Sequence, residues 1–413
     1  MDTFYLQITK EEETEYKVLL DTTGFTALRQ KLRTLLDAWQ FETVKIAVAG
    51  ESGVGKSTFI NSLRGLKADD TGAAPVGVTE TTLECEKFPF PNYPNVELWD
   101  LPGFGTTTFP EMKSYVKEVG FEDYDLILLL SATRFKADDA RLAVEIQQVQ
   151  QNKQNKHDLF FVRTKVDNDV QGLKLAQRKK PTNVDIKTRL QAIRQNSSEL
   201  LRKQDIENHD IFLIDNYNTV KFDFPRLTST LIGKVGDLKR NALMFALRGF
   251  TEDIDSVVKA LQGRINEVSK AAAVAGAYTE REEDRPPEEA NLLFEEAKFY
   301  CEQLGLDLQA NVFLVVNKTL DENIENLIEA LDLRSFGLAE TLESFEQHYR
   351  QFDQFKPDFH HRLPLIGGIL KTRAFQKQCA RALKAFLDIC EQDVHKLTAY
   401  IQDAIEQNDE FRC

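Results

Sequence analysis

The feature that most constrains the fold is a glycine-rich turn between an apolar run and a helical pattern. The apolar run VKIAVAG (44–50) leads into ESGVGK, and STFINSLRG (57–65) continues with the spacing of a helix. Apolar strand, tight turn and helix in this order predict a β-α unit of a parallel sheet. Such a turn presents successive backbone N–H groups at the positive end of the helix, which is where proteins bind phosphate.

The residue types of this turn are those that grip a nucleoside phosphate. The pattern G-x-x-x-x-G-K-[ST] is met by Gly50, Gly55, Lys56 and Ser57. Lys56 is expected to reach the β- and γ-phosphates, and the Ser57 hydroxyl is expected to ligate Mg²⁺. The predicted phosphate-binding residues are Gly50, Glu51, Ser52, Gly53, Val54, Gly55, Lys56, Ser57 and Thr58.

Short apolar runs separated by helical patterns continue through the first half of the chain. The runs are VKIAVAG (44–50), VELWD (96–100), DLILLL (125–130), DLFFVRT (158–164) and DIFLID (210–215). Strands that are nearly continuous in apolar residues are typical of a parallel sheet covered by helices on both faces. We therefore predict an α/β domain with a parallel-dominated sheet over residues 41–232, with its site at the carboxyl ends of the strands.

Helical patterns flank this domain on both sides. Phe25, Leu28, Leu32, Leu35, Leu36 and Trp39 form one apolar stripe at helical spacing. After about Thr230 strand signals fade, and helical stretches follow around 291–305, 320–352 and 372–406. We predict that residues 1–40 pack with a C-terminal all-α domain of residues 233–413, and that 278–290 is an exposed loop within it.

Two further strand ends indicate the metal and the base. Asp100 ends the run VELWD, where a carboxylate can hold Mg²⁺ through water, and Gly103 frees a backbone N–H for the γ-phosphate. In RTKVD (163–167), Asp167 can accept both N1–H and the N2 amine of guanine, a pattern that adenine does not offer. Lys165 is expected to lie along the nucleotide while Thr164 braces the loop. The sequence therefore favours GTP and GDP with Mg²⁺ over ATP.

Other site residues are less sharply indicated. Asp215 and Asn216 end the last run, where a second base-contacting loop is expected, although capping of the next helix explains them equally well. Thr79, Thr81 and Thr82 can each complete the Mg²⁺ shell, and their chemistry does not choose among them.

Charge and cysteine usage exclude some classes of function. The 413 residues include 52 Lys and Arg against 66 Asp and Glu, a formal net charge of −14, which argues against nucleic acid as a partner. The five cysteines show no C-x-x-C spacing, and the first residues show no signal peptide. No apolar stretch approaches the ~18 residues of a membrane-spanning helix. These features predict reduced thiols and a cytoplasmic location.

With these motifs in place, the chain resembles the immunity-related GTPases, also called interferon-inducible GTPases. The resemblance covers most of the chain and is carried by GESGVGKSTFINSLRG, PNVELWDLPGFGTTTFP, YDLILLLSATRFKADD, FFVRTKVDND, FDFPRL (222–227) and FYCEQLGLD (299–307). It implies a G domain joined to N- and C-terminal helices, GTP hydrolysis, and a nucleotide-dependent dimer through G domains. It also implies cell-autonomous defence at intracellular membranes.

The resemblance assigns two catalytic residues besides Lys56. Counted without gaps from Lys56, the family's switch glutamate falls on Glu80 and its magnesium-side threonine on Thr82. The residue after Gly103 is Phe104, so no glutamine orients the attacking water from that position. Hydrolysis should then be slow in a single copy and faster on self-assembly. The alternative is a nucleotide-dependent scaffold with negligible turnover.

A basic helix near the C-terminus raises a membrane question. Arg373, Lys377, Arg381 and Lys384 fall on one face of a helix predicted to begin near Thr372, and Phe375, Cys379, Leu383 and Phe386 fall opposite. With the apolar run 363–370 before it, the segment 363–387 suits peripheral contact with an anionic membrane. A helix that packs in the core and has a solvated basic face is the simpler interpretation.

Overall fold

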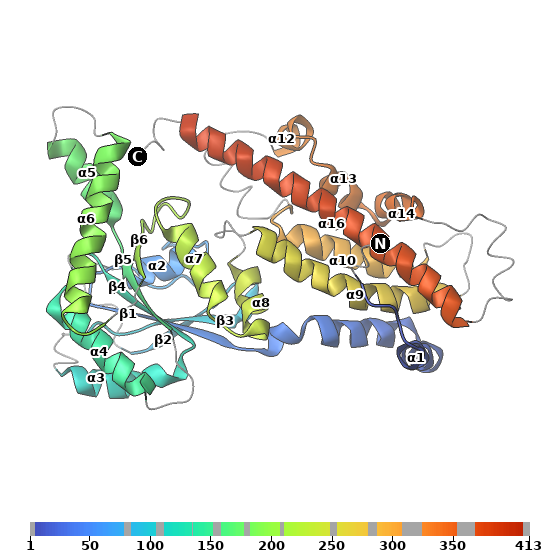
Figure 1. Cartoon of the computed structure of the whole chain (residues 1–413), viewed down its shortest axis with the longest axis horizontal. Coiled ribbons are helices and arrows are strands. Elements are labelled where there is room, and N and C mark those ends of the chain that lie inside the picture. The colour runs from blue at the N-terminus through green and yellow to red at the C-terminus, as the bar shows by residue number, and fades with distance from the viewer. Residues whose placement is uncertain are drawn as a thin grey trace. The chain divides into compact units, whose positions relative to one another are not determined.

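The phosphate-loop motif lies in a six-stranded sheet, and a separate set of helices forms the rest of the protein (Figure 1). The computed structural model describes residues 5–77, 84–104, 111–133, 135–151, 158–176, 182–206, 210–247, 254–279, 287–307, 324–352 and 368–407. Contacts divide the chain into a helical unit, Met1–Ala38 with Asp253–Arg412, and a sheet unit, Trp39–Glu252.

The sheet confirms the predicted α/β fold. Its strands are β1 (Val44–Gly50), β2 (Glu86–Phe90), β3 (Tyr93–Asp100), β4 (Leu126–Ser131), β5 (Asp158–Arg163) and β6 (Ile211–Leu213). They lie in the order β2-β3-β1-β4-β5-β6, and every neighbouring pair is parallel except β2 with β3. All six residues of β4 are buried, as a central parallel strand covered on both faces requires.

Helices cover both faces of the sheet (Figure 1). One face carries α3 (Met112–Val119), α4 (Ala137–Gln151) and α6 (Asn183–Arg202), and the other carries α2 (Lys56–Leu63), α7 (Phe224–Gly233) and α8 (Asp237–Ala246). The unit also contains η1 (Ala38–Phe41), η2 (Phe121–Asp123) and α5 (Val166–Ala176). The core under α4 joins Leu142 and Ile146 to Ile127 and Leu129 of β4. This packing fixes the strand ends that carry the predicted site.

Long helices make up the other unit. They are α1 (Lys10–Leu36), α9 (Ile254–Tyr278), α10 (Glu288–Gln303), α12 (Ile324–Ala330), α13 (Arg334–Glu340), α14 (Leu342–Arg350) and α16 (Gly368–Gln407). α9 and α16 lie side by side along much of their length (Figure 1). The alanine-rich end of α9 is fully buried from Ala271 to Ala275, because small side chains allow close helix approach.

The N-terminal helix is longer than its apolar stripe predicts. α1 begins at Lys10 behind a capping box of Thr9 and Glu12, and it is kinked at Gly24, which has φ 77°. Leu28 and Leu32 are buried as expected, whereas Leu35 is 50% exposed.

Trp39, the last member of that stripe, belongs to the sheet unit instead. It lies beyond the end of α1 in η1, and its ring packs edge-on against Phe245 with centroids 5.1 Å apart. The chain therefore leaves the helical unit before Trp39, and helical spacing across a helix end does not imply a shared face.

The second boundary between the units lies at 252/253, whereas the fading of strand signals predicts it at 232/233. The difference is α8, which packs on β1 and β3 of the sheet. Lys239 of α8 also forms an ion pair with Asp125 at the start of β4, with Nζ and Oδ1 2.7 Å apart. A helical pattern shows that a helix has an apolar face, but not which unit buries it.

The basic C-terminal helix packs its apolar face inside its own unit. Phe375, Cys379, Leu383 and Phe386 of α16 are all buried. This favours the simpler of the two interpretations for residues 372–387, while 363–367 lie outside the described residues. Among the described helices, none combines the length and apolar composition needed to cross a membrane.

Candidate nucleotide site

The glycine-rich turn lies close against neighbouring backbone at two glycines. Gly50 has φ 152°, and a Cβ atom there would lie 2.5 Å from the Leu130 carbonyl oxygen. A Cβ atom on Gly103 would lie 2.8 Å from the Ser52 backbone nitrogen. Any larger residue would therefore push the turn away from β4 or from the loop after β3. These contacts hold the turn at the carboxyl ends of β1, β3 and β4.

Lys56 and Ser57 begin α2 directly after the turn. The Lys56 ammonium donates to the carbonyl oxygens of Gly50 and Glu51, at 3.2 and 3.3 Å. The Ser57 hydroxyl donates to Asp100 Oδ2 at 2.6 Å, and Asp100 is buried at the end of β3. The structure thus brings together the three side chains that the sequence assigned to phosphate and Mg²⁺.

The loop after β5 is tied to the same turn. The Thr164 hydroxyl donates to the Val54 carbonyl at 2.7 Å, and the Lys165 ammonium donates to the Gly53 carbonyl at 2.9 Å. Lys165 has φ 57°, a left-handed conformation that is uncommon for residues other than glycine. Strain of this kind persists only where surrounding contacts determine it, and here the bond to Gly53 does so.

Asp167 and Asp215 lie near one another at the ends of β5 and β6. Asp167 is half-buried in the first turn of α5. Burial raises the pKa of Asp215, and the negative charge of Asp167 raises it further. The two carboxylates therefore lie close enough for their charges to interact, at the strand ends where the base-contacting loops are predicted.

The β6 loop also contacts the phosphate loop through Asn216. Its side-chain amide donates to the Gly55 carbonyl at 3.1 Å, and its own carbonyl accepts from the Ser62 hydroxyl. The Asp215 carboxylate accepts from Tyr217 N within a turn, and the next helix begins only at Phe224. The structure therefore does not place Asp215 or Asn216 as the cap of a helix.

Phe104 is part of the core. Only 2% of the residue is exposed, and its ring lies 6.0 Å from that of Tyr115, centroid to centroid. Glu51 and Phe104 form a single parallel bridge between the turn and the loop after β3. The first residue after Gly103 is thus a structural one, and it cannot orient a water molecule.

The predicted switch residues Thr79, Glu80, Thr81 and Thr82 lie outside the described residues, which stop at 77 and resume at 84.

A polar cavity of about 430 Å³ adjoins the turn, and its lining combines predicted phosphate-loop residues with Ser131, Lys136 and Asp139, which were not predicted as site residues. Glu51, Ser131, Lys136 and Asp139 are among its lining residues, and Lys136 forms an ion pair with Glu51 across it. Asp139 Oδ2 accepts from the backbone N–H of Lys136 at 2.8 Å, while its Oδ1 and the Ser131 hydroxyl are buried without a hydrogen-bond partner among the described residues. The motif SATRFKADD contains Ser131, Lys136 and Asp139. Acidic residues in the first turn of a helix are usually exposed, so the sequence alone does not indicate that Asp139 is buried.

Burial raises the pKa of Asp139 from its ordinary 3.8 to about 7. Between these two values the folded protein holds a proton that the unfolded chain releases, so stability falls as the pH rises through this window. Asp139→Asn has no such dependence and keeps an acceptor for Lys136 N–H. We expect this variant to be more stable than the parent protein at pH 8, by about 1–4 kcal/mol, with a much smaller difference at pH 4, close to the unfolded-state pKa.

Thermal unfolding of the nucleotide-free protein at the two pH values measures this effect. The matched control is Asp138→Asn, the same change at the exposed neighbour in α4. A variant at Asp139 that is no more stable than the parent at pH 8 would contradict the assignment of a costly buried charge.

Comparison with known proteins agrees with this geometry. The family model described as "Interferon-inducible GTPase (IIGP)" matches residues 18–403. T-cell-specific guanine nucleotide triphosphate-binding protein 2 of Mus musculus is 41% identical over 50% of this chain, and the chain spans only 48% of that relative. Interferon-gamma-inducible GTPase 10 of Mus musculus is 31% identical over 88% of this chain and 83% of its own length.

Among solved structures, Era of Aquifex aeolicus bound to GDP and AlF4⁻ aligns with 59% of this chain and 69% of its own, at 18% identity and a TM-score of 0.30. The family match covers most of the chain, including the nucleotide-site motifs and the helices that follow them. The chain belongs to the interferon-inducible GTPase family.

Proposed function

We propose that this protein binds GTP and GDP with Mg²⁺ and hydrolyses GTP, slowly as a single copy and faster when G domains of two copies meet. The observation that carries the proposal is the 2.6 Å hydrogen bond from Ser57 to Asp100 beside the buried Lys56. These three side chains meet at the start of α2. The turn before that helix ends in Gly55, whose φ of 95° favours glycine. That arrangement suits a triphosphate and its cation.

The donor chemistry of the site fits Mg²⁺. Mg²⁺ prefers hard oxygen ligands, and Ser57 and Asp100 offer a hydroxyl and a carboxylate within hydrogen-bond distance of each other. When bound, the cation neutralises charge that develops on the β- and γ-phosphate oxygens. Lys56 adds a fixed positive charge on the phosphate side, and the backbone of residues 53–57 adds N–H donors.

Among the described residues of the sheet unit, we identify no side chain that would orient the attacking water. Phe104 is buried in the core, and the side-chain amide of Asn216 donates to the Gly55 carbonyl. We propose that Glu80 orients the attacking water and that Thr82 completes the Mg²⁺ shell once a second copy closes the site. Low turnover in isolation follows, because positioning of the water supplies much of the rate in GTP hydrolysis.

Turnover measured against protein concentration tests this proposal. Specific activity should rise with concentration, and Glu80→Ala should abolish the rise while GTP binding persists. The loss should be at least about 100-fold, the usual contribution of a positioned catalytic group. Glu84→Ala is the matched control, since it removes an exposed carboxylate from the same stretch of chain.

Two results would contradict parts of the proposal. Full activity of Glu80→Ala at high concentration would remove that residue from catalysis. A flat turnover near zero at all concentrations of the parent protein would favour the alternative function, a scaffold that binds GTP or GDP and recruits partners.

We further propose peripheral contact with intracellular membranes, through charge and not through insertion of α16. The apolar face of that helix is buried, whereas Lys377 and Arg381 are exposed. Lys377→Glu together with Arg381→Glu should weaken flotation with phosphatidylserine vesicles by about tenfold or more, since each basic residue contributes about 1 kcal/mol.

The control for this experiment is Arg202→Glu with Lys203→Glu, which reverses two exposed charges in the sheet unit. Equal flotation of both double variants, or no flotation of the parent protein with GTP bound, would end the proposed contact through α16.

A further inference from the structure

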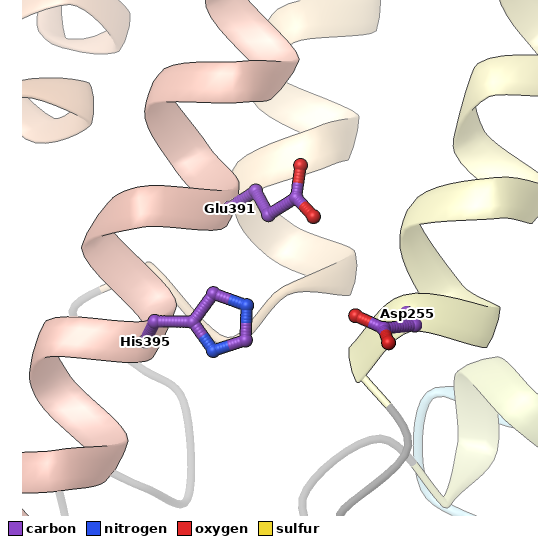
Figure 2. A group of neighbouring side chains, drawn as sticks. All are labelled: Asp255, Glu391 and His395. Atoms are coloured by element: carbon purple, nitrogen blue, oxygen red, sulfur yellow. The ribbon is translucent and has the colours of Figure 1, made fainter.

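Three side chains of metal-ligating type converge in the helical unit, whereas the residues of the nucleotide site belong to the sheet unit. Asp255 lies in the first turn of α9, and Glu391 and His395 lie one turn apart on α16 (Figure 2). One ligand atom from each residue lies within 4.8 Å of the others. We propose that Asp255, Glu391 and His395 form a site for a divalent transition-metal ion, with Zn²⁺ as the preferred occupant.

The helix geometry allows two residues of α16 to bind the same ion. Residues four apart lie on one face of a helix, with Cβ atoms about 5–6 Å apart, so Glu391 and His395 can reach a common ion. Figure 2 shows the side chains of Glu391 and His395 leaving α16 on the side where Asp255 lies. Zn²⁺ bonds of about 2.0–2.2 Å to nitrogen and oxygen require a modest contraction of this arrangement, within the reach of side-chain rotation.

The scaffold that holds the three residues is rigid. Val258 and Leu261 of α9 are buried, and so are Val394 and Leu397 of α16, within two residues of His395 in sequence. The two helices pack along much of their length, which fixes the rotation of each about its axis. The cluster therefore lies at the solvent edge of a packed helix pair and can accept an ion without refolding.

Charge also favours a cation at this position. Two carboxylates meet here, and no Lys or Arg forms an ion pair with either one within the part of the chain that the structure describes. The neighbouring Lys396 is engaged elsewhere: its ammonium donates to the Asp332 carbonyl at 2.7 Å and lies 3.7 Å from Asp393. A divalent ion would neutralise the two carboxylates, which otherwise repel.

The ligand set discriminates among metals. An imidazole with two carboxylates suits Zn²⁺, Co²⁺, Mn²⁺ or Ni²⁺, whereas Mg²⁺ and Ca²⁺ prefer oxygen ligands alone. Three protein ligands leave at least one coordination position for water. A bound ion would link the first turn of α9 to α16 and should stabilise the helical unit.

Zinc binding to the full chain tests the site. The protein is first treated with a chelator and then saturated with GDP and Mg²⁺, so that Ser57 and Asp100 are occupied. Calorimetric titration with Zn²⁺ should then show one ion bound per chain. His395→Ala and Asp255→Asn should each weaken the affinity for Zn²⁺ by at least tenfold. Even partners outside the coordination shell cost about 10- to 100-fold in metal affinity, so loss of a direct ligand should cost no less.

Asp403→Asn is the matched control, because Asp403 is exposed on α16 two turns beyond His395. This control should bind Zn²⁺ as tightly as the parent protein does. Zn²⁺ should raise the unfolding temperatures of the parent and of Asp403→Asn, but not that of His395→Ala. Titration with Co²⁺ separates this site from cysteine sites, since thiolate ligands give a charge-transfer band that nitrogen and oxygen ligands do not.

Three outcomes would overturn the proposal. They are no binding of Zn²⁺, binding that is equal in the parent, His395→Ala and Asp255→Asn proteins, or a thiolate band that accounts for the bound metal. Because Asp255 and His395 are exposed, neither substitution should prevent folding, and each outcome is therefore decisive.

Discussion

Asp167→Asn is expected to change the preferred base from guanine to xanthine. A carboxylate at this position accepts from both N1–H and the N2 amine of guanine. An asparagine amide offers one acceptor and one donor, so its NH₂ group would face the guanine amine. Xanthine carries a carbonyl oxygen at that position, and the amide can then donate to it while still accepting from N1–H.

The expected loss of GTP affinity is at least about 100-fold, because a hydrogen bond to a charged group contributes about 1.5–3 kcal/mol and the new donor meets a donor. XTP should bind the variant more tightly than it binds the parent protein. Both affinities can be measured by displacement of a fluorescent GDP or XDP analogue.

The control for this experiment is Asp205→Asn, the same chemical change at an exposed turn residue whose φ of 57° asparagine tolerates. Unchanged GTP affinity of Asp167→Asn would mean that another residue reads the base. Asp215 is the first alternative, since Asp167 affects its pKa and both lie at neighbouring strand ends.

The parts of the fold that follow from local pattern could be predicted. Apolar runs gave the positions of β1, β3, β4, β5 and β6, because a parallel strand buried on both faces needs nearly continuous apolar residues. β2 was not predicted. Its residues Glu86 and Lys87 are exposed and it contains Pro89, which is typical of an edge strand and resembles a loop in sequence.

Features that depend on which surfaces meet could not be predicted. Asp139 looks like an ordinary acidic residue in the first turn of a helix, and only the packing of α4 on the sheet buries it. Asp255 and His395 are far apart in sequence, and only the pairing of α9 with α16 brings them together. Lys56, Ser57 and Asp100 were predictable because parallel strands end at one edge, which places their carboxyl-terminal residues side by side.

Lys56→Ala is expected to abolish tight nucleotide binding. Lys56 is buried, and in the structure its ammonium donates to the Gly50 and Glu51 carbonyl oxygens. A bound phosphate offers charged oxygens in exchange, and charge-assisted hydrogen bonds are about twice as strong as neutral ones. Loss of two such bonds should reduce the affinity for GTP and for GDP by at least about 100-fold.

Two measurements separate this effect from damage to the fold. GDP with Mg²⁺ should raise the unfolding temperature of the parent protein and not that of Lys56→Ala, because a ligand stabilises only the state that binds it. Circular dichroism of the variant should match that of the parent. Lys67→Ala, an exposed lysine beyond α2, is the control that should keep the response to GDP.

Together with Glu80→Ala, this variant separates binding from catalysis. Lys56→Ala should lose both, whereas Glu80→Ala should lose turnover and keep GTP. A Lys56→Ala protein that still binds GTP tightly would contradict the phosphate-loop assignment itself. If Lys56→Ala loses binding while Glu80→Ala retains turnover, the loop binds phosphate as proposed, and the water-orienting group must lie elsewhere in the chain or in a partner.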